Sequence, residues 1–440
     1  MMEALRSDAT WILIVAPRKS NALEILSDLQ GGAGFANVAV ELGTTHNMFH
    51  RPQHRTVRIA SAALLLQSLN ARGPKPLQGL DLVICENLDQ LDASYELGVS
   101  LLRHSTQYSP TRFVGISNSL NDATDLAAWL DVDQFSYHSF RPTDRGQSLM
   151  TMTQTFTVPQ SAALFKVMAK PAHMVIQGSS SAIVFVPSRG QTYPVARDLL
   201  TRCALEDQSE RGYLDSEAIA EAVEYHLVKL QDKSLKDFVS KGVGFFHDGI
   251  KRQDRSLMLQ LYAEGIIRVM IVSREACWFL PIRADVVVVM GTQYIQPATE
   301  REEQRLREYD LTEIVRMQSR AVTHSGAGQF HLFCQAESRD TYARFLNDGL
   351  PLESSLPGSK ELVSWYQDRR KQRDLLDKQS AVDALSFTFL AQRIVTNPAY
   401  YDCQSTSRDK NLSWIADQLA EGDSLPVSLE QATGSAAPGS

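Results

Sequence analysis

An acidic residue directly follows an apolar run in the segment DLVICENLDQLD, Asp81 to Asp92. The run LDLVIC has the composition of a buried strand, so Glu86 falls at the carboxyl end of that strand. Ligands of parallel α/β sheets bind outside the carboxyl ends of the strands, and Mg²⁺ prefers oxygen ligands such as carboxylates. The segment therefore raises the hypothesis that a nucleotide's metal ion is held here, or once was.

A nucleotide site of this kind also needs a loop that cradles the phosphates. The glycine-rich motif GxxxxGK[ST], placed between a strand and a helix, supplies that loop. The motif does not occur in the sequence. About ten residues precede the first apolar run, too few for a strand, a loop and a helix. The strongest single signal for ATP hydrolysis is therefore absent.

Composition sets further bounds. The chain has 440 residues, enough for two or three domains, and a hydrophobic content of 43%, ordinary for a globular fold. Its net charge of −7 predicts no general attraction to a polyanion, so any RNA contact needs a local basic surface. The N-terminus lacks a hydrophobic signal core, and no apolar run approaches the roughly 18 residues of a membrane span. We expect a soluble intracellular protein without membrane contact.

The cysteines are far apart in the sequence and show no metal-ligand spacing. This favours reduced thiols that act as small core residues, and it argues against a disulfide framework or a zinc site. They are Cys85, Cys203, Cys277, Cys334 and Cys403.

Apolar runs alternate with helical patterns along the chain. WILIVAP predicts a buried strand, and SNALEILSDL predicts a helix capped by Ser20, whose apolar face contains Ala22, Ile25, Leu26 and Leu29. Further strands are predicted in LDLVIC, TRFVGIS, AIVFVP, IRVMIVS and ADVVVVMG, and a further helix in NDATDLAAWL. Strands that are apolar on both faces are typical of parallel sheets covered by helices.

This pattern occurs twice, in residues 11–139 and 181–348. The polar, proline-marked segment FRPTDRGQSLMTMTQTFTVPQ between the two blocks is interpreted as a linker. We therefore predict an α/β lobe over 1–150, a second over 160–350, a helical part over 360–420 and a disordered tail over 421–440.

Several segments also carry a family resemblance, in order from about Trp11 to Leu419. GISNSLNDATDLAAWL, AIVFVPSRGQT, GVGFFHDGI, VSREACWFLPIRADVVVVMGTQY and AVDALSFTFLAQRIVTNPAYYDC resemble motifs of the DExH-box RNA helicases with an attached winged helix. The likeness is greatest to the C-terminal helicase cassette of the large two-cassette spliceosomal helicase of the U5 snRNP. It implies two tandem RecA-like lobes followed by a partial winged helix, with the phosphate-loop unit missing from the first lobe.

The resemblance also assigns residues to vestigial catalytic positions. In active relatives an Asp holds magnesium, a Glu orients the attacking water and a His couples to the second lobe; Cys85, Glu86 and Leu88 occupy those positions here. Met317 and Arg320 stand where two arginines would face the triphosphate, and Phe279 replaces a glycine of the fifth motif. We expect no catalytic residues, no metal site, and neither ATP nor magnesium as a cofactor.

Residues that the resemblance places along the RNA survive in part: Pro17, Arg18, Ser188, Arg189 and Arg274. A solvated loop is an equally good interpretation of Arg18 and Lys19. Simpler roles compete elsewhere too: Glu86 as a solvated or capping acid, Arg320 in a surface or inter-lobe ion pair, and His247 as a hydrogen-bonded turn residue.

Two further segments favour structural interpretations. The mixed charges of ATEREEQRLREYD, Ala298 to Asp310, predict an exposed helix or loop. The aromatic residues of the helical part are expected in its core; they are Trp365, Tyr366, Phe387, Phe389, Tyr400 and Tyr401.

Two functions remain open. The first is a catalytically degenerate helicase-like module that binds spliceosomal proteins or an active helicase cassette in the nucleus, with weak RNA contact. The second is an ATP-dependent RNA helicase completed by residues outside this chain. By resemblance the missing phosphate-loop strand is central, so we expect a gap in the first sheet and a chain that is poorly stable or depends on a partner.

Overall fold

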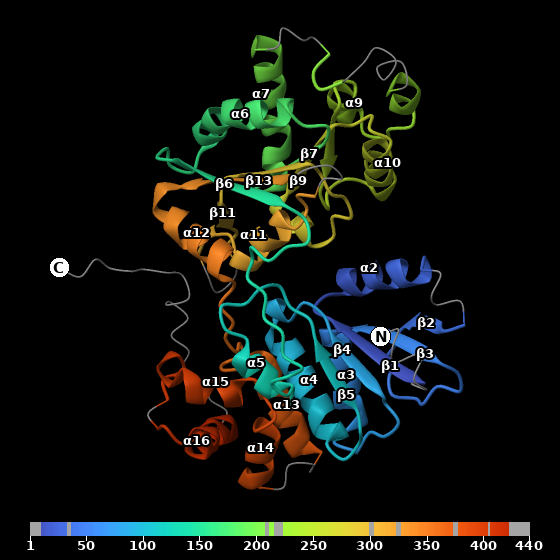
Figure 1. Ribbon diagram of the computed structural model, residues 1–440, viewed down its shortest axis with the longest axis vertical. Coiled ribbons are helices and arrows are strands. Elements are labelled where there is room, and N and C mark those ends of the chain that lie inside the picture. The colour runs from blue at the N-terminus through green and yellow to red at the C-terminus, as the bar shows by residue number, and fades with distance from the viewer. Residues whose placement is uncertain are drawn as a thin grey trace, which may run out of the picture. The chain divides into compact units, whose positions relative to one another are not determined.

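The computed structural model describes residues 10–32, 37–206, 211–214, 223–298, 303–322, 327–372, 377–403 and 405–421. They form two compact units, Met1–Pro142 with Asp348–Ser440, and Thr143–Asn347 (Figure 1). All but the first residue of the predicted disordered tail, 421–440, lie outside the described residues.

The first unit contains a parallel sheet of five strands in the order β2-β3-β1-β4-β5. The strands are β1 (Trp11–Ala16), β2 (Ala39–Leu42), β3 (Thr56–Ser61), β4 (Leu82–Cys85) and β5 (Arg112–Gly115). The strands predicted in WILIVAP, LDLVIC and TRFVGIS are confirmed. Strands β2 and β3 were not predicted, because TVRIAS places Arg58 in an otherwise apolar run and AVEL is short.

The prediction of a gap in this sheet is wrong. Strand β1 pairs with β3 on one side and with β4 on the other, and β4 pairs with β5, so the described strands form one continuous sheet. Strand β5 is a terminal strand of this sheet. Its residues Arg112 and Gly115 are exposed, and the two residues between them are only partly buried. Because the strands pair directly with one another, the sheet has no interior gap. The expectation of a poorly stable chain depended on that gap.

Helices cover both faces of the first sheet (Figure 1). Helix α2 (Lys19–Gln30) lies on one face, with Ala22 buried and Ile25, Leu26 and Leu29 packed against the strands as predicted. Helices α3 (Ala62–Arg72) and α4 (Ala93–Thr106) pack together on the other face. The predicted Ser20 cap is wrong: the helix begins at Lys19, Arg18 is its N-cap residue, and no side chain caps it.

The helical part belongs to the same compact unit as this sheet. It consists of α13 (Lys360–Lys371), α14 (Lys378–Leu385), α15 (Leu390–Thr396) and α16 (Arg408–Glu421), and α5 (Thr124–Trp129) adjoins α15. Its core includes Leu66 and Leu97 of the first lobe's helices. Between Gly349 and Glu421 the described residues include helices and turns but no strand.

The aromatic prediction for this part holds for four residues. Trp365, Tyr366, Phe389 and Tyr401 are buried. Phe387 is half-buried and Tyr400 is 45% exposed, so these two are not core residues.

The second unit contains a sheet of six strands in the order β6-β13-β10-β7-β9-β8, all in parallel pairs. The strands are β6 (Leu149–Phe156), β7 (Ala182–Val186), β8 (Val243–Phe246), β9 (Val269–Ser273), β10 (Val286–Met290) and β13 (Gly328–Gln335). The strands predicted in AIVFVP, IRVMIVS and ADVVVVMG are confirmed.

The interpretation of 140–160 as a linker is partly wrong. Residues Leu149–Phe156 form β6, which pairs with β13 over its full length. The sequence LMTMTQTF is polar because β6 is a terminal strand of the sheet and most of its residues are exposed. Its threonines and its phenylalanine favour a strand, a preference that a search for continuous apolar runs does not detect.

Helices α6 (Ala162–Gln177) and α7 (Arg189–Glu206) lie on one side of the second sheet, and α11 (Leu311–Gln318) and α12 (Arg339–Asp348) on the other (Figure 1). Helices α9 (Lys233–Val239) and α10 (Arg252–Ala263) contact β8. A short antiparallel pair, β11 (Gln293–Gln296) and β12 (Arg305–Glu308), follows β10. The expectation of a helix or loop over 298–310 is therefore wrong for 305–308, and 299–302 lie outside the described residues.

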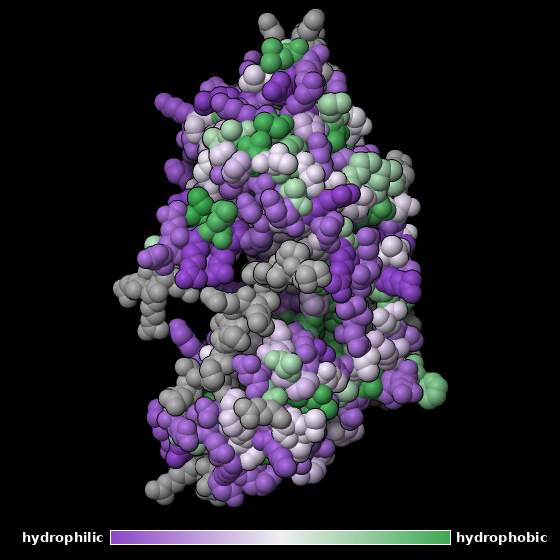
Figure 2. All heavy atoms as spheres, turned by 90° about the vertical axis from the view of Figure 1, so that its left-hand side faces the viewer, coloured by the Kyte–Doolittle hydropathy of each residue, from purple (hydrophilic) through white to green (hydrophobic). Residues whose placement is uncertain are grey.

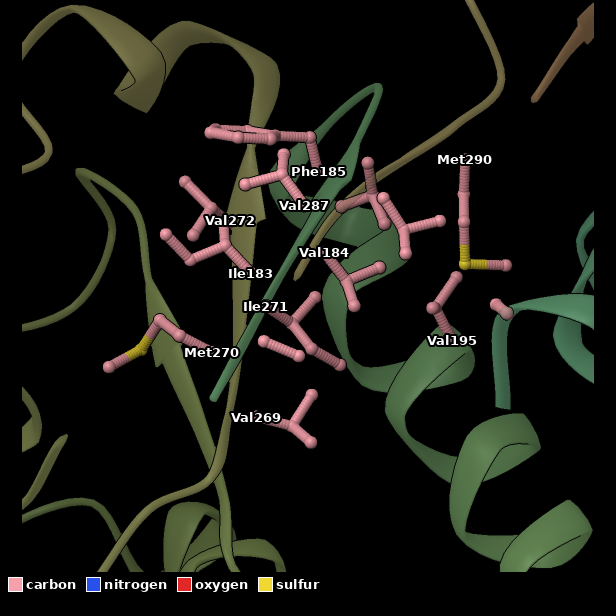
Figure 3. Close-up of a cluster of buried hydrophobic side chains, with 14 of the residues drawn as sticks. Ile183, Val184, Phe185, Val195, Val269, Met270, Ile271, Val272, Val287 and Met290 are labelled. Atoms are coloured by element: carbon pink, nitrogen blue, oxygen red, sulfur yellow. The ribbon is translucent and has the colours of Figure 1, made fainter. Parts of the chain in front are cut away.

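The core of the second unit is built from the apolar strands that the sequence predicts. Ile183, Val184, Ile271, Val272 and Val287 are fully buried and lie side by side across neighbouring strands (Figure 3). Four cysteines are buried as predicted, namely Cys85, Cys203, Cys277 and Cys334, while Cys403 is partly exposed.

The surface is mostly hydrophilic on the face shown in Figure 2, with hydrophobic residues in separate small patches. Within the described part of the chain, no helix combines the length and the apolar character required to cross a bilayer.

Candidate functional site

Cys85 and Glu86 lie at the carboxyl end of β4, the second strand from the edge of the first sheet. The Cys85 side chain is fully buried, and burial, reinforced by the charge of Glu86, raises the pKa of its thiol to about 12. A neutral thiol is a poor ligand for a hard cation such as Mg²⁺. The position that resembles a metal-holding aspartate therefore holds a core side chain.

Glu86 is half-buried, and burial raises the pKa of its carboxyl group. Its backbone N–H donates to Val15 O at 2.8 Å, and its carbonyl accepts a hydrogen bond from the Tyr95 hydroxyl at 2.8 Å. The backbone is thus fixed between β1 and α4. The interpretation of Glu86 as a fully solvated acid does not fit its partial burial.

Leu88 follows in a 3₁₀ turn, Leu88–Gln90, and its side chain is fully buried. A Cβ atom built on Gly115 would lie 2.8 Å from the Leu88 Cδ1 atom, so this leucine packs directly under the end of β5. The buried Asp89 carboxylate accepts hydrogen bonds from Asn118 N at 2.9 Å and Asn118 Nδ2 at 3.0 Å. The turn is tied down by apolar packing and by a carboxylate that is already engaged.

Pro17 and Arg18 stand at the end of β1, the strand beside β4. Pro17 is buried, whereas Arg18 is exposed and its Nη1 atom donates to Gln90 Oε1 at 2.5 Å. Of this pair, only Arg18 is accessible to a phosphate.

Met317 and Arg320 belong to the second unit, where α11 ends. Met317 is fully buried, and Arg320 is 4% exposed. The backbone of Arg320 joins the core too, because its carbonyl accepts a hydrogen bond from Ala284 N at 2.9 Å. The expected surface position of Arg320 is therefore wrong.

Arg274, the first residue after β9, is committed to contacts within the unit. Its Nη1 atom lies 2.7 Å from Glu313 Oε1, and its guanidinium carbon lies 3.6 Å from the centre of the Tyr294 ring. Burial lowers the pKa of Arg274, but the Glu313 carboxylate outweighs it and the net direction is upward. The expected RNA contact of Arg274 would require breaking these interactions.

Ser188 and Arg189 are exposed at the carboxyl end of β7, and α7 begins with Arg189. A Cβ built on Gly249 would lie 3.5 Å from Arg189 Nη1 and 3.2 Å from His247 Nδ1, so these two side chains meet at Gly249. Since α7 and α10 both begin at this edge of the sheet, their N-terminal N–H groups add positive potential. Ser188 and Arg189, together with Arg18, are the residues of the predicted RNA contact that are exposed.

His247 does not have the hydrogen-bonded role expected of it. Its side chain is 6% exposed, and neither ring nitrogen has a hydrogen-bond partner among the described residues. Burial lowers the pKa of His247, and the charges of Arg189 and Arg255 lower it further against the opposing effect of Asp248. A neutral imidazole with unused polar atoms sits beside an exposed arginine.

Phe279 stands at the end of the 3₁₀ turn Arg274–Trp278 and is 36% exposed. Its ring centroid lies 5.5 Å from that of Phe246, and the Arg255 guanidinium lies 5.7 Å from both rings. Sequence reasoning did not single out Phe246 or Arg255. The spacing of Lys251, Arg252 and Arg255 at the start of a helix was the available signal for a local basic surface.

No three His, Cys, Asp or Glu side chains within the described ranges are grouped as metal ligands would be. The two strand-end sites thus differ in character. At the end of β4 the first unit presents the buried, uncharged side chains of Cys85 and Leu88, and the second presents cations around an aromatic pair.

Comparison with known proteins identifies relatives of this chain. It is 34% identical over 317 residues to the U5 small nuclear ribonucleoprotein 200 kDa helicase of Homo sapiens, a match that covers 71% of this chain and 14% of the relative. It is 31% identical over 373 residues to the RQC trigger complex helicase SLH1 of Saccharomyces cerevisiae, covering 80% of this chain and 18% of the relative.

A third relative is the pre-mRNA-splicing factor brr2 of Schizosaccharomyces pombe, 29% identical over 363 residues, with 79% of this chain and 16% of the relative covered. The chain thus spans less than a fifth of the length of these relatives. No protein-family model matches the chain.

Proposed function

Because this chain belongs to the family of Brr2-like helicases, of which it matches a segment, we propose that it is a helicase-like module without ATP turnover of its own. In this proposal it serves as a protein-interaction and regulatory part of a pre-mRNA splicing helicase. It corresponds to the C-terminal cassette of such a protein, and its helices over 360–421 correspond to part of a winged helix.

The buried state of Cys85 is the observation that carries this proposal. ATP hydrolysis in this fold needs a charged group at the end of β4 to hold the magnesium that bridges the phosphates. The Cys85 thiol is fully buried, and its raised pKa keeps it neutral. Leu88 and Met317 are fully buried as well, so the three side chains contribute packing where the reaction would need polar groups.

The names of the relatives support a proposal for partners and location. They include a component of the U5 small nuclear ribonucleoprotein and a pre-mRNA-splicing factor. We propose spliceosomal proteins, or an active helicase cassette, as partners, and the nucleus as the location. RNA contact is proposed through the exposed Arg18 and through Arg189 beside His247.

An ATPase assay tests the loss of turnover. With Mg²⁺, ATP and single-stranded RNA present, the purified chain is expected to hydrolyse ATP no faster than the same buffer without protein. The matched control is Glu86→Gln, which removes the remaining acid of the site. RNA-stimulated hydrolysis that disappears in Glu86→Gln would overturn the proposal, whereas hydrolysis that persists in this variant comes from a contaminant.

A further inference from the structure

The partly exposed aromatic ring of Phe279 packs against a buried ring, that of Phe246. Phe246 beneath it is 2% exposed, and the two ring planes are inclined by 45° at a centroid distance of 5.5 Å. The Arg255 guanidinium lies within cation–π distance of both rings. One ring is thus anchored in the core while more than a third of the other remains accessible.

The charge around this ring is opposite to the charge of the whole chain. Arg189, Lys251, Arg252 and Arg255 lie at the starts of α7 and α10. Arg189 Nη1 and His247 Nδ1 both lie within 3.5 Å of the point where a Cβ on Gly249 would stand. Acids are also close to these cations in sequence. Asp254 of α10 is buried and accepts hydrogen bonds from Gln231 N and Asp232 N, and Asp248 precedes the helix. Glu275 lies 3.6 Å from Arg274 Nη2. A chain with a net charge of −7 therefore concentrates cations at one strand edge.

His247 provides an independent sign of a missing ligand. A polar group buried without a hydrogen bond destabilises the fold by about 1–3 kcal/mol, so such groups are rare without a reason. Both ring nitrogens of His247 are in this state within the described part of the chain, next to Arg189 and adjacent in sequence to Phe246. A bound group with hydrogen-bonding atoms would remove this penalty.

From this arrangement we propose that the exposed face of Phe279 is a stacking platform for one base of a single-stranded RNA, held by Arg255 and flanked by the phosphate-binding side chains Arg189 and His247. Accessible aromatic faces beside a cationic groove are the means by which proteins bind single strands with little sequence preference. This inference rests on the RNA contact proposed above. It adds a base-binding residue at a position where the family resemblance leads one to expect a glycine, which has no side chain to stack.

The test combines RNA affinity with a direct signal of stacking. The full 440-residue chain is titrated with a short oligouridine that carries 2-aminopurine at one position in turn, and both anisotropy and 2-aminopurine fluorescence are recorded. Phe279→Leu keeps an apolar contact with Phe246 and removes the aromatic face. Phe279→Trp enlarges that face, and Arg189→Ala removes a charge without altering the ring.

The proposal predicts that 2-aminopurine is quenched in one register by the native chain and by Phe279→Trp. Phe279→Leu is expected to lose that quenching and to bind RNA roughly 5- to 150-fold more weakly, the range for one stacked base. Its dependence on salt should remain that of the native chain. Arg189→Ala should instead reduce the slope of log affinity against log salt by about 0.7, the value for one phosphate of a single strand.

The possible outcomes distinguish failure of the proposed RNA contact from failure of the proposed base stacking on Phe279. Absence of RNA binding by the native chain overturns the RNA contact and the platform together. RNA binding with equal affinity and equal quenching in Phe279→Leu overturns the platform alone. Circular dichroism and thermal melting of each variant establish that a loss of binding is not a loss of folding.

Discussion

The carboxyl group of Glu96 accepts a hydrogen bond from the backbone N–H of Leu390 at 2.7 Å. Glu96 lies in α4 beside the first sheet, whereas Leu390 opens α15 of the helical part. The Ser354 hydroxyl donates to the second carboxyl oxygen, also at 2.7 Å. Glu96 is completely buried, so this carboxyl group joins two parts of the first unit while isolated from solvent.

This geometry predicts that stability depends on pH. Burial raises the pKa of Glu96 to about 7, although the hydrogen bonds from Ser354 and Leu390 oppose the rise. The folded state therefore binds the proton more tightly than the unfolded chain, and the free energy of unfolding falls as pH rises from about 4.5 to about 7. The expected decrease is about 2–4 kcal/mol, since one pKa unit corresponds to about 1.4 kcal/mol.

Glu96→Gln should remove this dependence, because the amide oxygen can still accept from Leu390 and the side chain no longer ionises. Urea unfolding of native and variant chains at several pH values measures it, with Glu264→Gln, an exposed residue of the second unit, as the control. A native chain and Glu96→Gln with the same pH profile would contradict the prediction.

Arg393 joins the helical part to the first lobe by a second route. It lies 2.5 Å from Asp125 of α5 and 2.5 Å from Glu353, and Tyr401 donates to the same Glu353 carboxylate at 2.7 Å. These side chains are 15–21% exposed, so solvent weakens the pairs only in part. Arg393→Ala should lower the free energy of unfolding by about 1–3 kcal/mol and increase amide hydrogen exchange in α15.

The matched control is Lys378→Ala. Lys378 pairs with Asp417 at 2.6 Å, but their side chains are 46% and 51% exposed, so the expected effect is below about 1 kcal/mol. Equal destabilisation by the two substitutions would show that Arg393 contributes no more than a surface pair.

Cys85 offers a test of whether the carboxyl end of β4 can hold a metal ion. Cys85→Asp would place a carboxylate in a fully buried position, where it needs either protonation or a cation. We expect it to lower the free energy of unfolding by about 2–4 kcal/mol, with no recovery on addition of millimolar Mg²⁺. Cys85→Ser, close in size to the native residue, controls for the loss of the thiol. Restored stability of Cys85→Asp in Mg²⁺ would mean that a metal site persists.

The ion pair between Arg274 and Glu313 predicts that breaking it will lower the free energy of unfolding of the second unit. Their side chains are 11% and 4% exposed and 2.7 Å apart, so Arg274→Ala leaves a buried carboxylate without its partner. The expected loss of unfolding free energy is about 2–4 kcal/mol, measured by guanidinium titration. Glu275→Gln, which alters the exposed neighbour at 3.6 Å, should change it by less than about 1 kcal/mol. An effect of Arg274→Ala no larger than that of Glu275→Gln would contradict the structure.

The sequence predicted the strands that are continuous apolar runs, such as β7 and β10, because Ile183–Val184 and Val286–Val289 are apolar on both faces and occur between helical patterns. It missed the interior strands β3 and β13, whose apolar runs are interrupted by Arg58 and by His331. It did not predict β6, whose exposed threonines and methionines resemble a linker when hydrophobicity alone is considered. Propensity and hydrophobicity disagree at a sheet edge, where one side of the strand faces solvent.

The positions of the candidate site residues came from the resemblance, whereas their surroundings could not be read from the sequence. The complete burial of Cys85, Leu88 and Met317 depends on neighbours distant in sequence. Arg274 illustrates the same limit, because its commitment to Glu313 joins residues 39 positions apart. The ring of His247, whose nitrogens lack partners among the described residues, and the contact of Phe279 with Phe246 depend on three-dimensional neighbours that no local pattern specifies.

We propose that this chain has given up the nucleotide site of its family. Isothermal titration of the purified chain with ATP, in the presence of Mg²⁺ and again with EDTA, tests this most directly. The buried, neutral side chain of Cys85 predicts equal heats of dilution in both titrations and therefore no magnesium-dependent affinity. Micromolar binding that requires Mg²⁺ would contradict it.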